Sequence, residues 1–253
     1  MINKLTGIRV LFLYGCFFAP ALAISQDNND STNQFLFSGT ITATSNGISP
    51  IPAFSLDKPA VLAYLSLHKK RFSYEPWIAF SSKGVPWFFN NCFRYKFVDR
   101  SKFTLRGGVI WGLGYSYPNV DRNGTPKTVA QAERFLWFEF SPIYKFTDRF
   151  SISSTTYSGS GFGDGTVDHI NFISLTANIT KVPLFDQIYF NFSPQVFYLN
   201  IDGPTRGIFV SGVFALGYFG VPFTLSTQMN ETLTTNLSPD PGFKWNVSVS
   251  YDF

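Results

Sequence analysis

Hydrolysis needs a nucleophile and a base at defined places, and histidine is the most common base. The chain has only two histidines, His68 and His169. Neither lies in a local pattern with serine, although His169 can approach Ser151 or Ser153 across a hairpin. We therefore predict no catalytic residues and expect that the protein is not an enzyme.

Metal ligands are equally sparse. Two histidines and Cys92 do not make a convincing zinc site. Asp164 and Asp168 flank a glycine-rich stretch at residues 161–165, where calcium binding is one interpretation and a solvated loop is the favoured one. We predict no metal and no cofactor. Cys92 also has no partner for an intramolecular disulfide, if the N-terminal segment that carries the other cysteine is removed.

A third set of candidate functional residues is polar or charged and alternates with large apolar residues. It comprises Glu75, Arg94, Lys96, Arg106, Glu139, Gln195, Gln228 and Lys244. Two roles remain open for these candidate lumen-lining residues. They can line a water-filled pore and select solutes by charge, or they can pair and fill the interior as a structural network. The mixed signs favour pairing, whereas an anion-selective channel needs a more uniformly basic lining.

The elements that position these residues are predicted to be β-strands. From Phe35 onward the sequence divides into about twelve stretches rich in aromatic and β-branched residues, separated by turn residues. In the last stretch, Phe243–Phe253, apolar and polar residues alternate strictly, and Leu136–Phe146 follows a similar pattern. Because successive side chains of a strand point to opposite faces, each stretch has one apolar face and one polar face.

Composition indicates which environment each face meets. Aromatic residues make up 19 % of the chain and charged residues only 14 %, against about 25 % charged residues in typical soluble domains. So many aromatic side chains would overfill a small soluble barrel. Strands of about ten residues are long enough to cross a bilayer when tilted. We therefore predict an all-β, antiparallel transmembrane β-barrel of twelve strands, at residues 35–253.

The connections provide an independent test of this prediction. Those at the end where the chain enters are short: His68–Arg71, Asp99–Lys102, Thr147–Arg149, Lys181–Gln187 and Phe219–Pro222. Most of those at the opposite end are longer: Asn46–Ala60, Ser81–Pro86, Pro118–Ala132, Ser158–Asp168, Asp202–Arg206 and Thr234–Gly242. Short periplasmic turns and longer extracellular loops are typical of transmembrane barrels.

The N-terminal residues have the pattern of an export signal. Residues 1–23 have a charged start, an apolar centre at Val10–Phe18 and the small-residue site Ala21-Leu22-Ala23, so we predict a cleaved signal peptide. A transmembrane helix is disfavoured because the apolar run is too short. A lipoprotein anchor at Cys16 is disfavoured because the apolar run continues past it. Residues 24–34 are predicted to be a flexible periplasmic segment.

These residues resemble the outer-membrane β-barrel superfamily of Gram-negative bacteria. The resemblance rests on Ala21-Leu22-Ala23 and on the ending Val247–Phe253. It implies location in the outer membrane, contact with outer-membrane lipid, and recognition of the terminal Phe253 by the barrel-assembly machinery. A twelve-stranded barrel is similar to small channels for nucleosides or acidic sugars, and also to the outer-membrane phospholipase.

We expect a porin or channel that passes small hydrophilic solutes through a polar lumen. Loops such as Pro118–Ala132 or Ser158–Asp168 would form a constriction. The first alternative is a non-conducting barrel that acts as an accessory or scaffold subunit of an outer-membrane complex. The second is an outer-membrane lipid-modifying enzyme. The formal net charge is +4, and the basic residues form no stripe, so we expect no nucleic-acid partner.

Overall fold

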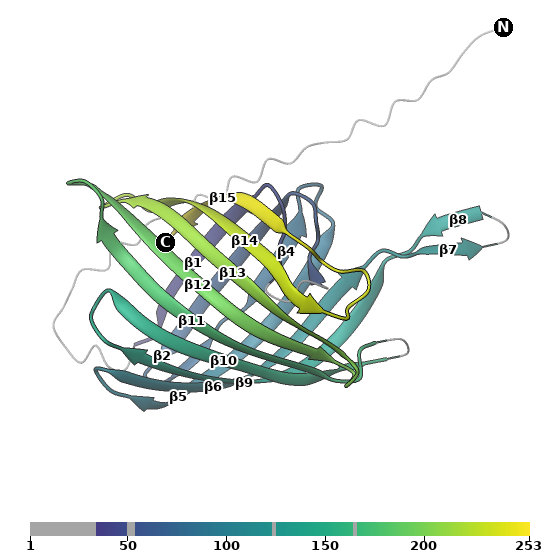
Figure 1. Cartoon of the computed structure of the whole chain (residues 1–253), viewed down its shortest axis with the longest axis horizontal. Helices are drawn as coiled ribbons and strands as arrows, with labels where there is room; N and C mark the ends of the chain where they lie inside the picture. Colours follow the sequence, from purple (N-terminus) through teal and green to yellow (C-terminus); the bar gives the residue numbers. More distant parts are fainter. Residues whose placement is uncertain (1–33, 50–53, 123–124, 164–165) are drawn as a thin grey trace, which may run out of the picture. The chain divides into compact units, whose positions relative to one another are not determined.

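A computed structural model describes residues 34–49, 54–122, 125–163 and 166–253 (Figure 1). The predicted signal peptide at residues 1–23 lies outside the described residues, and so does the predicted flexible segment at 24–34, apart from Gln34. Asp164 of the glycine-rich stretch also lies outside them. Among the described residues, no helix has the length and hydrophobicity needed to cross a membrane.

Fifteen antiparallel strands make up the described part of the chain. The first five are β1 (Leu36–Thr44), β2 (Ala60–Lys69), β3 (Phe72–Tyr74), β4 (Trp77–Ser81) and β5 (Pro86–Asp99). The next five are β6 (Phe103–Ser116), β7 (Asn119–Arg122), β8 (Thr125–Thr128), β9 (Gln131–Lys145) and β10 (Phe150–Phe162). The last five are β11 (Ile170–Pro183), β12 (Ile188–Ile201), β13 (Thr205–Tyr218), β14 (Phe223–Thr235) and β15 (Lys244–Asp252).

The main sheet closes on itself. Its strands pair in chain order around the barrel, with β6 next to β9, and β1 pairs with both β2 and β15. The short strands β3 and β4 together occupy one position between β2 and β5, while β7 and β8 form a separate two-stranded ribbon. The result is a closed antiparallel barrel of twelve strand positions, which confirms the predicted fold class and strand number (Figure 1).

The interruption between β3 and β4 has a simple cause. Pro76 has no N–H group to donate to a neighbouring strand. The chain leaves the ladder at Glu75 and Pro76, although Glu75 N still donates to Cys92 O over 2.8 Å. This irregularity fixes Glu75 beside the middle of β5.

The two faces of the strands differ as the sequence predicts. On β9, Phe138 and Phe140 are 59 % and 51 % exposed, while Glu139 and Ser141 between them are 4 % and 1 % exposed. Large apolar side chains therefore cover the outside of the barrel and polar ones point inward. A soluble barrel would place its apolar face inside.

The two ends of the barrel also differ. Five turns at one end join β2–β3, β5–β6, β9–β10, β11–β12 and β13–β14, and each is short. The other end, the long-loop end, carries the β1–β2 loop of residues 45–59 and the β7–β8 ribbon, which extends beyond the sheet (Figure 1). The predicted difference between short turns and long loops is confirmed.

Apolar side chains fill part of the interior near the long-loop end. Five apolar residues from three neighbouring strands form a buried group there, which we call the aromatic cluster: Ile170, Phe172, Phe197, Leu199 and Phe209. The rings of Phe172 and Phe197 lie 5.3 Å apart, and those of Phe197 and Phe209 lie 5.1 Å apart. Toward the short-turn end, the inward side chains are mainly hydroxyls and amides.

Candidate functional site

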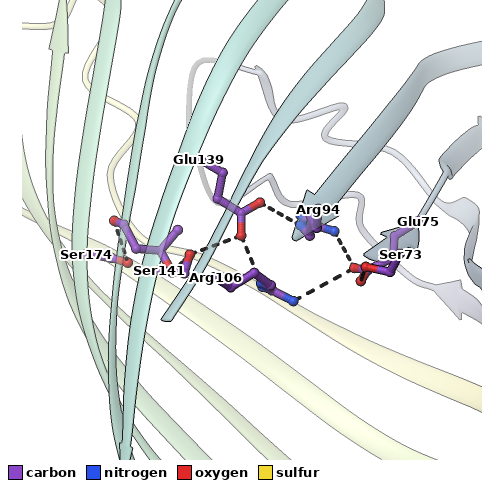
Figure 2. A network of polar contacts seen from close by, with 8 residues as sticks. Ser73, Glu75, Arg94, Arg106, Glu139, Ser141 and Ser174 are labelled. Atoms are coloured by element: carbon purple, nitrogen blue, oxygen red, sulfur yellow. Dashed lines mark hydrogen bonds and ion pairs between the residues drawn. The ribbon is translucent and has the colours of Figure 1, made fainter. Parts of the chain in front are cut away.

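Four of the eight predicted lumen residues meet in the middle of one wall of the barrel. Glu75, Arg94, Arg106 and Glu139 form a closed ring of ion pairs, which we call the charged cluster (Figure 2). They come from the β3–β4 break and from β5, β6 and β9. Residues distant in sequence thus converge because these four strand positions are adjacent in the sheet.

Arg94 is the centre of the charged cluster. Its Nε donates to Glu139 Oε2 over 2.7 Å, and one of its terminal nitrogens donates to Glu75 Oε2. Its guanidinium group also lies 4.7 Å from the centre of the Trp77 ring. Two carboxylates and an aromatic face therefore hold this cation in one orientation.

Arg106 closes the ring more loosely. One terminal nitrogen lies 3.1 Å from Glu139 Oε1 and the other lies 3.9 Å from Glu75 Oε2. Serine hydroxyls complete the carboxylate contacts: Ser73 donates to Glu75 over 2.6 Å, and Ser141 lies 3.0 Å from Glu139. The Arg106 side chain is 31 % exposed and that of Arg94 only 2 %, so Arg106 is the more accessible cation of the cluster.

A glycine makes the central ion pair possible. Arg94 pairs in register with Gly108 on β6, and Gly108 pairs with Glu139 on β9. A Cβ atom on Gly108 would lie 2.6 Å from Phe93 O and 2.9 Å from Arg94 Cγ. Because Gly108 has no side chain, Arg94 can extend across β6 to a carboxylate two strands away.

Burial makes this pairing necessary. The Arg94 and Glu139 side chains are 2 % and 0 % exposed, and an unpaired charge in such a place costs several kcal/mol. The cluster contains two cations and two anions, so its formal charges cancel. It therefore projects little net field into the lumen.

The other four predicted lumen residues stand apart from this cluster. Lys96 lies 3.4 Å from Asp99 near the short-turn end, and both side chains are largely exposed. Gln195 donates to Thr176 over 2.9 Å, and Gln228 donates to Asn230 over 3.1 Å. Each contributes to local hydrogen bonding.

Lys244 lies on the inward face of β15 at the long-loop end. Its Nζ lies 2.6 Å from Asp57 Oδ2 in the β1–β2 loop. Asn246, the next inward residue on β15, donates to Asn46 O of the same loop over 3.0 Å. Lys244 thus attaches a loop to the barrel wall.

The β1–β2 loop enters the mouth of the barrel. Phe54 O accepts a hydrogen bond from Trp87 Nε1 over 3.0 Å. The Phe54 ring lies 5.7 Å from that of Phe135 and 6.2 Å from that of Trp137, both on β9, and it packs against the aromatic cluster. No role was predicted for Phe54 from the sequence. The one feature that could have indicated a role is its position as an aromatic residue in a stretch rich in proline and glycine.

Neutral polar side chains line the wall formed by β10 to β14. On β10, β11 and β12, Asn178 donates to Ser153 over 3.2 Å and accepts from Ser193 over 3.3 Å. On β13 and β14, Ser211 donates to Asn230 over 2.7 Å. The side chains in these contacts are hydroxyls and amides, and none of them is ionised.

The structure does not assemble the hydrolytic pair considered from sequence. His169 precedes β11, and its N–H group donates to Asp202 Oδ1 over 2.8 Å. Ser153 pairs with Thr176, seven residues further along β11, which is about 23 Å at the rise of a strand. The other histidine, His68, lies within β2 rather than in the turn where it was predicted.

Within the described residues, no group of three or more His, Cys, Asp or Glu side chains is close enough to hold a metal ion. The arrangement can instead hold polar solutes through hydroxyls, amides and one half-exposed arginine. It can restrict their size where Phe54 and the aromatic cluster narrow the mouth.

Comparison with known proteins shows a shared fold. No protein-family model matches the sequence, and no curated protein matches it. Among solved structures, the NanC porin is similar with a TM-score of 0.50 and 9 % identity over 86 % of this chain and 99 % of that one. The chain has the fold of an outer-membrane β-barrel. In barrels of this fold the short turns are usually periplasmic and the long loops extracellular.

Other barrels of this class give weaker matches. LpxR from Salmonella typhimurium has a TM-score of 0.47 and 8 % identity, over 85 % of this chain and 99 % of that one. OmpT of Vibrio cholerae has a TM-score of 0.45 and 6 % identity, over 90 % of this chain and 100 % of that one. At such identities the likeness concerns the fold.

The comparisons correct one prediction. We expected that the protein is not an enzyme, because the sequence shows no catalytic pattern and the class suggested a porin. The solved barrels of similar fold include LpxR beside the NanC porin. Membership of this class does not exclude catalysis, and the exclusion was wrong.

Proposed function

We propose that the barrel is an outer-membrane channel for small hydrophilic solutes that carry little net charge. The observation that carries this proposal is the neutral polar wall of β10 to β14. Ser153, Asn178, Gln195 and Ser211 on this wall are half-exposed, which favours contact with water inside the barrel. Hydroxyl and amide groups can exchange hydrogen bonds with a passing solute at small net cost.

The charged cluster supports a preference for uncharged solutes. Its two arginines are balanced by two glutamates, whereas a strongly ion-selective pore uses rings of one sign. Arg106 remains half-exposed. Because the two glutamates balance its charge, Arg106 offers a polar contact to a solute without adding net charge to the lumen.

The extracellular mouth supports a limit on solute size. Phe54 and the aromatic cluster narrow the opening, and Lys244 holds the Phe54 loop through Asp57. Small solutes would pass beside this group more easily than large ones.

Solute uptake into proteoliposomes tests the proposal. Liposomes that contain the barrel should swell faster in small neutral sugars or amides than protein-free liposomes. They should swell more slowly as solute size increases. Equal swelling with and without the folded barrel would contradict a channel function.

A second candidate is a non-conducting barrel that serves as a scaffold in an outer-membrane complex. The dry aromatic cluster favours it, because Phe172, Phe197 and Phe209 are at most 2 % exposed and leave little space for water. This candidate predicts no solute uptake, and a stoichiometric partner protein after mild detergent extraction.

A further inference from the structure

The lipid-facing wall has a gap at Gly107 on β6. Gly107 pairs with Tyr95 on β5 and with Phe140 on β9, and these flanking side chains are 44 % and 51 % exposed. An outward glycine between two outward aromatic residues leaves a depression in the wall. The ring of Phe97 lies over its floor, since a Cβ on Gly107 would lie 2.7 Å from Phe97 Cε2.

The depression is a groove of about 470 Å³, which we call the Gly107 groove. Its apolar lining faces outward and includes Phe72, Phe93, Tyr95, Phe97, Val109, Phe138 and Phe140. Because this face of the barrel meets the hydrocarbon of the membrane, the groove suits an acyl chain. Gly107 is four residues from the start of β6, about 13 Å along the strand. The groove therefore lies in the periplasmic half of the wall.

Basic residues border the periplasmic end of this groove. The two turns that join β2–β3 and β5–β6 carry Lys70, Arg71, Arg100 and Lys102, and all four are exposed. The one acidic residue of these turns, Asp99, lies 3.4 Å from Lys96. None of the four basic residues forms an ion pair with another of the described residues.

The groove and the basic border are in direct contact. Arg71 Nη1 donates to Phe97 O over 3.3 Å, and Phe97 covers the floor of the groove. Lys145 N donates to Lys102 O over 2.8 Å, which keeps the β5–β6 turn beside β9. The β13–β14 turn, by contrast, consists of Phe219–Pro222 and has no charged residue.

We propose that this part of the wall is a binding site for one anionic phospholipid of the periplasmic leaflet. An acyl chain occupies the Gly107 groove, and Arg71, Arg100 and Lys102 bind the phosphate. Guanidinium groups and ammonium groups bind phosphate oxygens through charge-assisted hydrogen bonds. Basic pockets at the membrane surface recognise anionic headgroups by the same chemistry.

Native mass spectrometry of the detergent-solubilised barrel with added phosphatidylglycerol or phosphatidylethanolamine tests this proposal. The wild-type barrel should retain one phosphatidylglycerol molecule and bind phosphatidylethanolamine more weakly. The triple variant R71Q/R100Q/K102Q should bind phosphatidylglycerol about 100-fold more weakly, given the usual contribution of each basic residue near a lipid surface.

Two further variants separate the parts of the site. Arg134, Lys181 and Arg206 are exposed and lie on other parts of the barrel, so R134Q/K181Q/R206Q removes the same charge and should leave binding unchanged. Val109→Trp fills the groove with an apolar side chain on the lipid-facing wall and should weaken retention of both lipids. Circular dichroism confirms that each variant is folded.

The proposal is overturned by any of three results. Equal retention of the two lipids by the wild-type barrel would exclude recognition of the headgroup. If the two triple variants weaken phosphatidylglycerol binding equally, the effect depends on net charge alone and not on this site. Unchanged lipid retention by Val109→Trp would exclude the Gly107 groove as the site of the acyl chain.

Discussion

Arg94 Nε donates to Glu139 Oε2 over 2.7 Å, although these residues lie on strands separated by a third strand. Both side chains are almost fully buried. The interior therefore contains a fixed ion pair, and the stability of the barrel depends on the pair being complete.

Glu139→Gln should destabilise the barrel by about 3–5 kcal/mol, because it leaves Arg94 buried with one carboxylate fewer. The measurement is the free energy of unfolding in lipid vesicles, from a denaturant titration. Lys96→Gln is the matched control, since the Lys96–Asp99 pair is largely exposed and exposed pairs contribute at most about 1 kcal/mol. A loss no larger for Glu139→Gln than for Lys96→Gln would show that the charged cluster is not structurally important.

Gly108→Ala should lower the free energy of unfolding by about 1–3 kcal/mol, the usual effect of overpacking. The new methyl group would meet a backbone oxygen of Phe93 and the side chain of Arg94. Gly212→Ala serves as the control, because its Cβ would have its nearest contact at an ordinary 3.7 Å from Phe192. If the two variants are equally stable, the crossing of Arg94 over Gly108 does not require a glycine.

Most of the fold follows from the sequence alone. Strict alternation, as in Phe243–Phe253, depends only on the period of a strand, and it predicts the strand positions and the outward face. The turn lengths then predict the order and direction of the strands. The residues of the charged cluster were also recognisable as inward-facing, because a charge on the lipid side is costly.

The pairing within the interior did not follow from the sequence. Whether Arg94 meets Glu139 depends on register across three strands, and a shift of a single residue would separate them. The position of Phe54 depends on the path of a loop that has no periodic pattern. We predicted a constriction from Pro118–Ala132 or Ser158–Asp168. Val167 of the second stretch does pack against the aromatic cluster, but Phe54 of the β1–β2 loop packs there as well, and we predicted no such contact from the sequence.

Phe54→Ala should raise the single-channel conductance about twofold, because removal of the ring would widen the mouth at the constriction that we propose. Planar-bilayer recordings of the purified barrel measure this effect. Phe185→Ala provides the comparison, since Phe185 lies in a turn at the opposite end and is 73 % exposed. An unchanged conductance in Phe54→Ala would place the constriction elsewhere.

Phe138→Arg should destabilise the barrel by about 2–4 kcal/mol, the cost of a cation on the lipid-facing side of the bilayer. Phe138 lies in the middle of β9 and is 59 % exposed. Gln195→Arg places the same cation in the half-exposed lumen and should cost much less. Unfolding in vesicles compares the two variants. Equal losses would contradict the assignment of the two faces.

The most direct test of the channel proposal is the conductance of the folded wild-type barrel in a planar bilayer. We expect discrete conductance steps with weak ion selectivity, so that the reversal potential in a salt gradient lies near zero, because the charges of Glu75, Arg94, Arg106 and Glu139 cancel. A silent bilayer that contains correctly folded barrel would contradict the account. Strong selectivity for anions or cations would contradict the neutral lumen.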